Sequence, residues 1–502
     1  MNRTSLAARI QEILKTRPKA PADGPRADGR MPPGTPGRAA GPQVAEDDEE
    51  AAFAARCAAA EASSRVLEVL GATLREGARG PCVVVDRGYP ASHRHGHHRV
   101  ERFLTALRTS HVVLPWFLDR TGPADGLLSE PGDTSVEPRL LFFDLETTGL
   151  SGGAGTYAFL VGCGFFDGDE FHTRQFFLRG YGEERALLHA VEEELAREFS
   201  LRPCVLVTYN GRSFDVPLIE TRYQFNRLKS PLDDVPHVDM LFPARRLWKR
   251  RMLRAQPSTG PGPFGGRKGG FEAMARDEAP GSCALTALER DILGLHRQDD
   301  VPGWEIPARY FAYARTGDAR GLQAVLEHNR LDLLSLAAVA AIILEMAREG
   351  AEVARERHDC LALGRLLEYL GRLDDAERCF AAAALADGTL DVELDRVVRA
   401  DALHWLALHR RRVRRFEEAA EAWRQLTEIA GIDVELRHQA LEALAIHHEH
   451  RAKDLEAARL FALQALDLVG DGRRVDDVRY RLGRLSRKLD RGAGRERPLG
   501  DR

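Results

Sequence analysis

The sequence predicts an α/β domain, in which helices flank a mixed central sheet, followed by an all-α domain of helical repeats. Three strand-like runs follow one another between residues 140 and 178, and helical and strand-like segments then alternate. Beyond residue 350 the apolar residues keep a helical spacing. The sheet is therefore expected in the middle of the chain and the repeats in its C-terminal part.

Composition divides the 502-residue chain further, because this length exceeds what one hydrophobic core usually organises. Residues 1–45, rich in Pro, Gly, Ala and Arg, are expected to form a disordered tail. Residues 46–137 are expected to form a small extension, with a helix over 46–76 and a strand over 82–86. The remaining units are expected to be the α/β domain at 138–349 with a flexible Pro/Gly-rich insertion at 256–282, the repeats at 350–490 and a disordered tail at 491–502.

The α/β domain shows clear element boundaries. Its predicted strands are the run before Asp144, Tyr157–Phe166, Phe171–Leu178 and Val205–Tyr209. Its predicted helices are Glu183–Phe199, Val216–Phe225 and a long final helix over Gly321–Glu349.

The C-terminal part repeats an apolar-x-x-Ala-x-x-x-aromatic phrase. The alanines of its copies are Ala376, Ala419 and, in a looser copy, Ala458. Their separations of 43 and 39 residues exceed the ~34-residue period of a tetratricopeptide repeat, so the pattern is only tetratricopeptide-like. Stacked helix pairs of this kind usually form a binding surface, here for a protein partner or for substrate.

Charge and cysteine content restrict the class of protein. The net charge of −4 excludes a uniformly basic coat, so a nucleic-acid surface has to be local. The seven cysteines form no CxxC pair, which is typical of buried thiols in a reducing compartment. No apolar stretch approaches the ~18 residues of a membrane span. We therefore expect a cytoplasmic protein that makes no membrane contact.

Two acidic residues follow the first strand of the α/β domain. Asp144 and Glu146 are two positions apart, so both side chains leave the same face of a strand. Adjacent carboxylates repel each other unless a cation lies between them, and hard oxygen ligands suit Mg²⁺ or Mn²⁺ rather than zinc. The alternative is an exposed acidic strand end.

Asp215 follows an Asn-Gly turn after the strand Val205–Tyr209, close to the start of the next helix. The free N–H groups at such a helix start favour anions and phosphate. The alternative interpretation makes Asp215 a helix N-cap.

His328 and Asp332 are four positions apart within the predicted final helix. Both therefore project from one face, separated by roughly 6 Å along the axis. This face can present a metal ligand together with a proton acceptor. The alternative is an ordinary ion pair on a helix surface.

The three acidic motifs occur in an order that resembles a known superfamily. Asp144-x-Glu146, then Asn210-Gly211-x-x-Phe214-Asp215, then His328-x-x-x-Asp332 resemble the DEDD (DnaQ-like) 3'-5' exonucleases. The segments at 153–162, 238–241 and 300–307 add a resemblance to the YprB-like branch, over about residues 140–346. The resemblance implies a ribonuclease H-like fold. The best-known branches have Tyr with three intervening residues or His with four, whereas this chain has His with three.

The resemblance also implies a mechanism, in which two Mg²⁺ or Mn²⁺ ions about 3.5 to 4 Å apart hydrolyse a phosphodiester bond. Asp144 would bridge the ions, Glu146 and Asp332 would hold the ion on the water side, and Asp215 would hold the other. His328 would orient or deprotonate the attacking water. The implied substrate contacts are Thr147, Thr148, Gly149 and Leu150 against the terminal nucleotide, with Asn210, Arg212 and Ser213 as candidate phosphate contacts.

The expected function is a metal-dependent exonuclease acting on single-stranded or frayed ends of DNA or RNA. Two alternatives stay open: a non-catalytic nucleic-acid-binding or scaffold protein that works through its repeats, and a structure-specific endonuclease.

Two further signals concern histidines and basic residues. The histidines at 93, 95, 97 and 98 are more typical of an exposed loop than of a metal site. The basic run at 245–254, which contains Trp248, is either a nucleic-acid contact with an aromatic stacking residue or a solvated helix face.

Overall fold

The structure is a computed structural model that describes residues 61, 63–118, 137–149, 155–201, 203–254, 283–354, 356–385, 392–468 and 473–493. The chain divides into two units, Met1–Glu61 and Ala62–Arg502, and every strand and helix named below lies in the second. The tail expected at 1–45 and the insertion expected at 256–282 lie outside the described residues. So does most of the tail expected at 491–502, although the last helix reaches Ala493.

A seven-stranded mixed sheet forms the centre of the α/β part, with the strand order β1-β2-β7-β6-β5-β8-β9. β5, β8 and β9 are parallel, whereas β6, β7, β2 and β1 continue the sheet as antiparallel neighbours. The strands are β1 (Thr73–Arg75), β2 (Cys82–Tyr89), β5 (Arg139–Thr147), β6 (Ala158–Asp167), β7 (Glu170–Phe177), β8 (Cys204–Thr208) and β9 (His237–Asp239), with a separate hairpin of β3 (Arg94–His95) and β4 (His98–Arg99).

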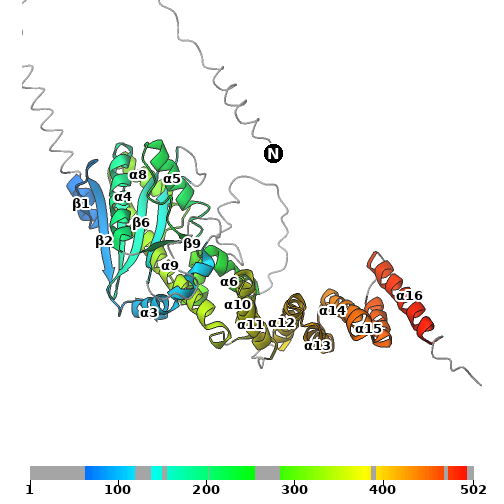
Figure 1. Cartoon of the computed structure of the whole chain (residues 1–502). Coiled ribbons are helices and arrows are strands. Elements are labelled where there is room, and N and C mark those ends of the chain that lie inside the picture. Colours follow the sequence, from blue (N-terminus) through cyan, green and yellow to red (C-terminus); the bar gives the residue numbers. More distant parts are fainter. Residues whose placement is uncertain are drawn as a thin grey trace, which may run out of the picture. The chain divides into compact units, whose positions relative to one another are not determined.

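Helices cover both faces of this sheet (Figure 1). On β5, Leu141, Phe143 and Leu145 belong to the hydrophobic cluster that includes α4 and α5, whereas Phe142 belongs to the cluster that includes α3 and α9. This alternation is what a strand buried on both faces requires. The helices of this part are α3 (Val100–Ser110), α4 (Glu184–Leu201), α5 (Asp215–Phe225), α6 (Leu241–Arg254), α7 (Leu285–Leu288), the π-helical turn η4 (Glu289–Leu293), α8 (Ile306–Thr316) and α9 (Gln323–Glu349).

The predicted mixed sheet with flanking helices is confirmed, and the differences lie at its N-terminal end. The helix expected to reach residue 76 ends at residue 70, because Gly71 adopts a left-handed φ of 58°. Thr73–Arg75 then forms β1 and pairs with β2, which itself pairs with β7. The expected N-terminal extension thus contributes two strands to the main sheet.

The C-terminal region is helical, as predicted, and each helix packs on the next. Its helices are α10 (Arg357–Tyr369), α11 (Leu373–Leu385), α12 (Val392–Arg412), α13 (Phe416–Glu428), α14 (Val434–His447), the π-helical turn η7 (His448–Ala452), α15 (Leu455–Asp467) and α16 (Arg473–Ala493). None of the described helices is both long and apolar enough to cross a membrane.

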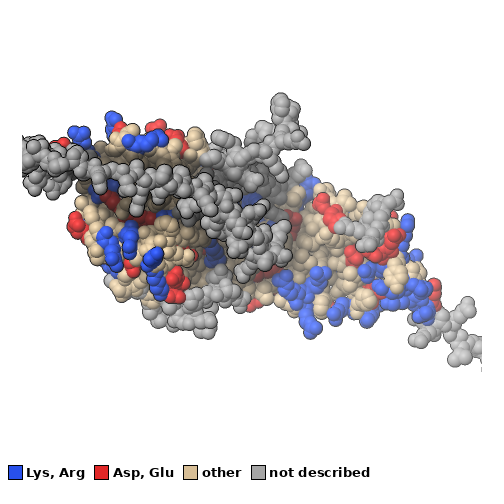
Figure 2. Space-filling model, turned by 90° about the horizontal axis from the view of Figure 1, so that it is seen from above, with Lys and Arg blue, Asp and Glu red and all other residues tan. Residues whose placement is uncertain are grey.

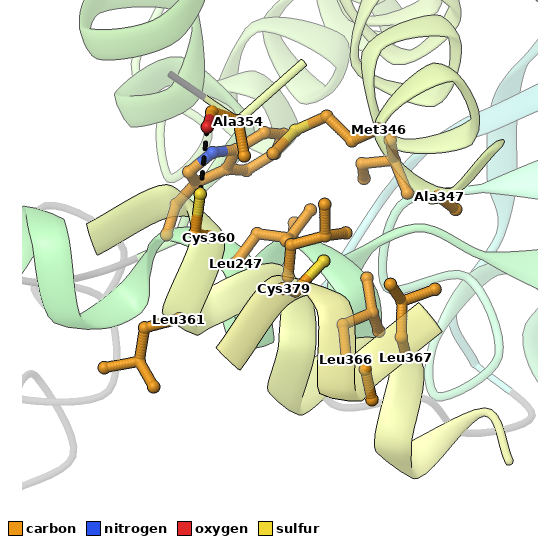
Figure 3. Close-up of a cluster of buried hydrophobic side chains, with 14 of the residues drawn as sticks. Leu247, Met346, Ala347, Ala354, Cys360, Leu361, Leu366, Leu367 and Cys379 are labelled. Atoms are coloured by element: carbon orange, nitrogen blue, oxygen red, sulfur yellow. Dashed lines mark hydrogen bonds between the residues drawn. The ribbon is translucent and has the colours of Figure 1, made fainter. Parts of the chain in front are cut away.

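One hydrophobic cluster joins the α9 side of the sheet to the C-terminal helices. Figure 3 shows Leu247 of α6 beside Met346 and Ala347 of α9 and beside apolar residues of α10. The α9 residues at this junction are buried. The first C-terminal helices therefore share their core with the helices that carry the candidate site.

Candidate active site

Asp144 and Glu146 lie on β5, between β6 and β8. They alternate with the buried Phe143 and Leu145, so their side chains leave the sheet on the face covered by α9. The pairing with β6 shifts register between Glu146 and Thr147, where the strand ends. Both acids are half-buried, as the predicted pair on one face requires.

The Asp144 carboxylate is held by Asn329, a fully buried residue of α9. Asn329 Nδ2 donates to Asp144 Oδ2 at 2.7 Å, and Gln175 Nε2 donates to Asn329 Oδ1 at 2.7 Å. Gly162 pairs with Asp144 and with Gln175 in the sheet, and a Cβ on Gly162 would lie 2.3 Å from Asn329 Oδ1. The glycine therefore leaves the space that Asn329 needs to reach Asp144.

Asp215 is the first residue of α5, and Phe214, which makes no side-chain cap hydrogen bond, is the N-cap. The N-cap interpretation of Asp215 is therefore wrong. The preceding turn contains Asn210 with a φ of 68° and is fixed by Asp239, which accepts hydrogen bonds from the backbone N–H groups of Asn210 and Arg212 at 2.8 and 3.1 Å. A backbone hydrogen bond at Leu145 brings the Asp215 carboxylate against β5.

His328 and Asp332 project from the same face of α9, as predicted. His328 Nε2 lies 3.6 Å from Asp332 Oδ2, and His328 Nδ1 lies 2.8 Å from Asp300 Oδ1. Although burial lowers the pKa of His328, the charge of Asp332 and the hydrogen bond with Asp300 hold it above its ordinary value.

Arg297 lies at the centre of this group, and its side chain is only 5% exposed. Its guanidinium contacts the carboxylates of Glu289 at 2.6 and 2.7 Å, of Asp300 at 3.2 Å and of Asp332, and Nη1 lies 3.3 Å from His328 Nδ1. A single buried cation thus compensates several acids and fixes the position of Asp332.

The electrostatics of the four acids are unfavourable for ionised carboxylates. Burial, followed by the charges of Asp332 and Asp215, holds the pKa of Asp144 and of Glu146 well above the ordinary range. Burial raises the pKa of Asp215 to about 7, although backbone hydrogen bonds at Leu145 and at Asp215 itself lower it. A nearby cation would relieve the mutual repulsion that these shifts express.

The donor chemistry of the site fits a hard divalent cation. All four candidate ligands are carboxylates, which suit Mg²⁺ or Mn²⁺. Across the described residues, however, no group of three or more His, Cys, Asp or Glu side chains is arranged closely enough to hold a metal ion. Asp144 and Asp332 have Asn329 and Arg297 as partners instead.

The candidate substrate contacts divide into two groups. Thr147 Oγ1 donates to Gly149 O at 2.9 Å, and Thr148 Oγ1 accepts from Tyr157 N at 2.9 Å, so both hydroxyls order the chain after β5. Arg212 and Ser213 are exposed beside Asp215. Leu150 lies outside the described residues.

The histidine run was expected to be an exposed loop. It forms the β3–β4 hairpin instead. His95 is buried and shares a hydrogen bond of 2.7 Å with Ser335 of α9, which in turn donates to Glu289. Burial, with the charge of Arg297, lowers the pKa of His95 to about 3, so the ring is neutral. The hairpin therefore supports the residues that hold Arg297.

The sequence reasoning missed Asn329, Arg297, Asp300 and Glu289. Asn329 lies one position along α9 from His328 and reaches Asp144 through the space above Gly162. A buried polar residue in an otherwise apolar helix was the available signal. Arg297 has Glu289 and Asp300 as partners nearby in sequence, but its contact with Asp332 spans 35 positions and has no local signal.

Two comparisons agree with this geometry. Residues 141–344, from β5 to α9, match the family model described as the RNase_H superfamily. The chain is also 27% identical over 416 residues to "Uncharacterized protein YprB" of Bacillus subtilis (strain 168), covering 81% of this chain and 86% of the relative. The first match supports an RNase H-like domain with a nuclease-type function, and the second extends the similarity beyond that domain.

Proposed function

We propose that residues 138–349 form a metal-dependent 3'-5' exonuclease that hydrolyses DNA or RNA from single-stranded or frayed ends. The observation that carries the proposal is that four acids from three separate segments lie near enough to influence one another electrostatically: Asp144 and Glu146 from β5, Asp215 from the start of α5 and Asp332 from α9. Burial, and after it the charges of the neighbouring acids, raise the pKa of Asp144 and Glu146, which agrees with a site that binds a cation.

Each residue has a proposed role. Asp144, Glu146, Asp215 and Asp332 would hold two Mg²⁺ or Mn²⁺ ions, which when bound activate a water and stabilise the leaving oxygen. His328 would orient the water and accept its proton at Nε2, because Asp300 occupies Nδ1. Asn329 and Arg297 would keep Asp144 and Asp332 in position. Thr147, Thr148, Gly149, Asn210, Arg212 and Ser213 are proposed substrate contacts.

The C-terminal helices at 350–490 are proposed to be a tetratricopeptide-like module that binds a protein partner or guides substrate. Support comes from the sequential packing of α10 to α16. The six cysteines among the described residues are free and buried, which agrees with the proposed cytoplasmic location.

The test is cleavage of single-stranded DNA and RNA labelled at either end. We expect products shortened from the 3' end with Mg²⁺ or Mn²⁺, no cleavage in EDTA, and no cleavage by Asp144→Ala or Asp332→Asn. Asp86→Asn, which removes an exposed strand carboxylate far along the sheet from β5, is the matched control and should cleave normally.

Other outcomes would point to other functions. Cleavage that survives EDTA or both substitutions contradicts the proposed site. Cleavage of circular single strands would instead indicate an endonuclease, and oligonucleotide binding without metal-dependent cleavage would indicate a non-catalytic protein.

A further inference from the structure

Helix α6 has two different faces. Its inner face is fixed in the core, where Leu241, Ala244 and Leu247 are buried (Figure 3 shows Leu247). Trp248 is also buried, so it is not the stacking residue that the basic run suggested. The outer face carries the exposed residues Phe242, Arg245, Arg246 and Lys249, and the exposed Tyr369 of α10 lies beside it. We call these five residues the α6 surface.

Two aromatic rings and a guanidinium form a cluster on the α6 surface. Phe242 is 44% exposed and Tyr369 is 57% exposed, with their ring centroids 4.9 Å apart. Arg246 lies against both rings, 4.6 Å from the centroid of Phe242 and 3.8 Å from that of Tyr369. Large rings this exposed beside a cation are typical of surfaces that stack nucleobases.

The basic residues of the α6 surface have no acidic partner within the described part of the chain. Among the described residues, no carboxylate forms an ion pair with Arg245, Arg246 or Lys249. Elsewhere basic residues are commonly paired, as Arg410 and Arg415 are with Glu377, and Figure 2 shows Lys and Arg mixed with Asp and Glu over much of the surface. Unpaired cations next to exposed rings complement a phosphate backbone that carries unpaired bases.

The α6 surface begins at the edge of the sheet that carries the acids. Asp239 at the end of β9 accepts hydrogen bonds both from Leu241 N at 3.0 Å and from the turn that precedes Asp215. β9 is two strands from β5, a separation of about 10 Å. Phe242 to Lys249 then extends about 10 Å along the helix. When the end of a nucleic-acid strand reaches the acids, the nucleotides next to that end lie beside the α6 surface.

We propose that the α6 surface binds single-stranded nucleic acid next to the candidate active site. Arg245 and Lys249 contact phosphates, while Phe242 and Tyr369 stack on unpaired bases with Arg246 held between them. The bases of a duplex are already stacked, so the exposed rings favour a single strand. This inference rests on the proposed nuclease function for its substrate, but its binding test does not require cleavage.

The experiment measures fluorescence anisotropy of a labelled single strand of about 12 nucleotides in EDTA, across a series of salt concentrations. The full-length protein is compared with Arg245→Glu/Lys249→Glu and, separately, with Tyr369→Ala. We expect the charge-reversal variant to bind at least about tenfold more weakly, with a salt slope smaller by about one unit per lost phosphate contact. Tyr369→Ala should weaken binding while leaving the slope unchanged.

The matched control is Arg65→Glu/Arg87→Glu, which changes the net charge equally at two exposed residues, one in the helix before β1 and one on β2, at the opposite end of the sheet from β9. It should leave affinity and slope unchanged. With metal, the Arg245→Glu/Lys249→Glu variant should raise KM for the long strand and cleave a dinucleotide at the normal rate.

Three results would overturn the inference. The first is unchanged oligonucleotide affinity in Arg245→Glu/Lys249→Glu, which would leave the surface to an acidic protein partner. The second is an equal loss of affinity in the Arg65→Glu/Arg87→Glu control. The third is equal affinity for duplex and single strand. If binding depends on the α6 surface but wild type never cleaves, the proposed function fails and this inference stands. If wild type cleaves but the α6 variants bind normally, the inference alone fails.

Discussion

Two sites in this chain bury carboxylates with opposite surroundings: at Glu449 cations outnumber the acid, and at the candidate active site acids outnumber the cations. Glu449 of η7 has a fully buried side chain and lies within 3.4 Å of three cations from α16, namely Arg481, Arg484 and Lys488. Although burial raises the pKa of Glu449, hydrogen bonds from Arg484 and Lys488 lower it to about 2. This acid connects α16 to η7, the turn between α14 and α15.

The candidate active site has four acids, and among the described residues Arg297 is the one Lys or Arg side chain that contacts any of them, through Asp332. The pKa values of Asp144 and Glu146 are raised there, in contrast to that of Glu449. A buried carboxylate that serves stability alone is expected to have cations as partners. A buried carboxylate kept for binding or catalysis can lack such partners, at a cost to stability. The contrast therefore assigns a structural role to Glu449 and supports a functional one for the four acids.

The largest effect is expected from Asp144→Asn, which keeps the shape of the side chain but removes its charge. Cleavage should fall by about three orders of magnitude, because losing several kcal/mol of transition-state stabilisation costs about tenfold per 1.4 kcal/mol. Single-turnover cleavage of an end-labelled oligonucleotide measures this. Glu449→Gln, which also removes one buried negative charge, is the control and should cleave at the wild-type rate. An equal loss of cleavage in Asp144→Asn and Glu449→Gln would contradict the different roles assigned to the two carboxylates.

A smaller loss is expected when the support of Asp144 is removed. Asn329→Ala should reduce cleavage by about 10- to 100-fold and the free energy of unfolding by about 1–3 kcal/mol, because a buried hydrogen-bonded amide is lost. Gly162→Ala should reproduce the loss of cleavage with Asn329 still present, since the added Cβ would displace the amide. Normal cleavage by both variants would show that Asn329 does not position Asp144. Cleavage rates and urea unfolding measure the two effects.

Glu449→Gln is expected to act on stability alone, lowering the free energy of unfolding by about 1–3 kcal/mol through weakened charged hydrogen bonds to α16. The folded pKa of about 2 lies below the ordinary glutamate value of 4.5, so this contribution is complete above pH about 4.5 and is lost as the pH falls towards 2. Hydrogen exchange of α16 at pH 7 should be faster in the variant. At about pH 3 the difference should shrink, and a difference that grows there would contradict the assignment.

The fold was more predictable than the site because its signals are local. The alternation along β5 and the apolar periodicity of α9 predict a strand and a helix from neighbouring residues, and both are present close to the expected bounds. β1 was not predicted, since its three residues continue a helical composition and become a strand only by pairing with β2.

For the site, residue types and spacing were sufficient to select Asp144, Glu146, Asp215, His328 and Asp332. They were not sufficient to find the partners of these residues. Arg297 reaches Asp332 across 35 positions and Asn329 reaches Asp144 across 185, contacts that only the packing of α9 on the sheet creates. Trp248 was misjudged for the same reason, because its burial depends on α9 and α10.

The most direct test of the claim that the four acids are kept for a cation is thermal unfolding of wild type and Asp144→Asn, each in EDTA and in Mn²⁺. In EDTA we expect the variant to be more stable by about 1 kcal/mol, because one repelling charge is gone. Mn²⁺ at about 100 times its dissociation constant should stabilise wild type by about 2.7 kcal/mol and the variant much less. The claim would be contradicted if the variant were less stable than wild type in EDTA and were stabilised by Mn²⁺ as much as wild type is.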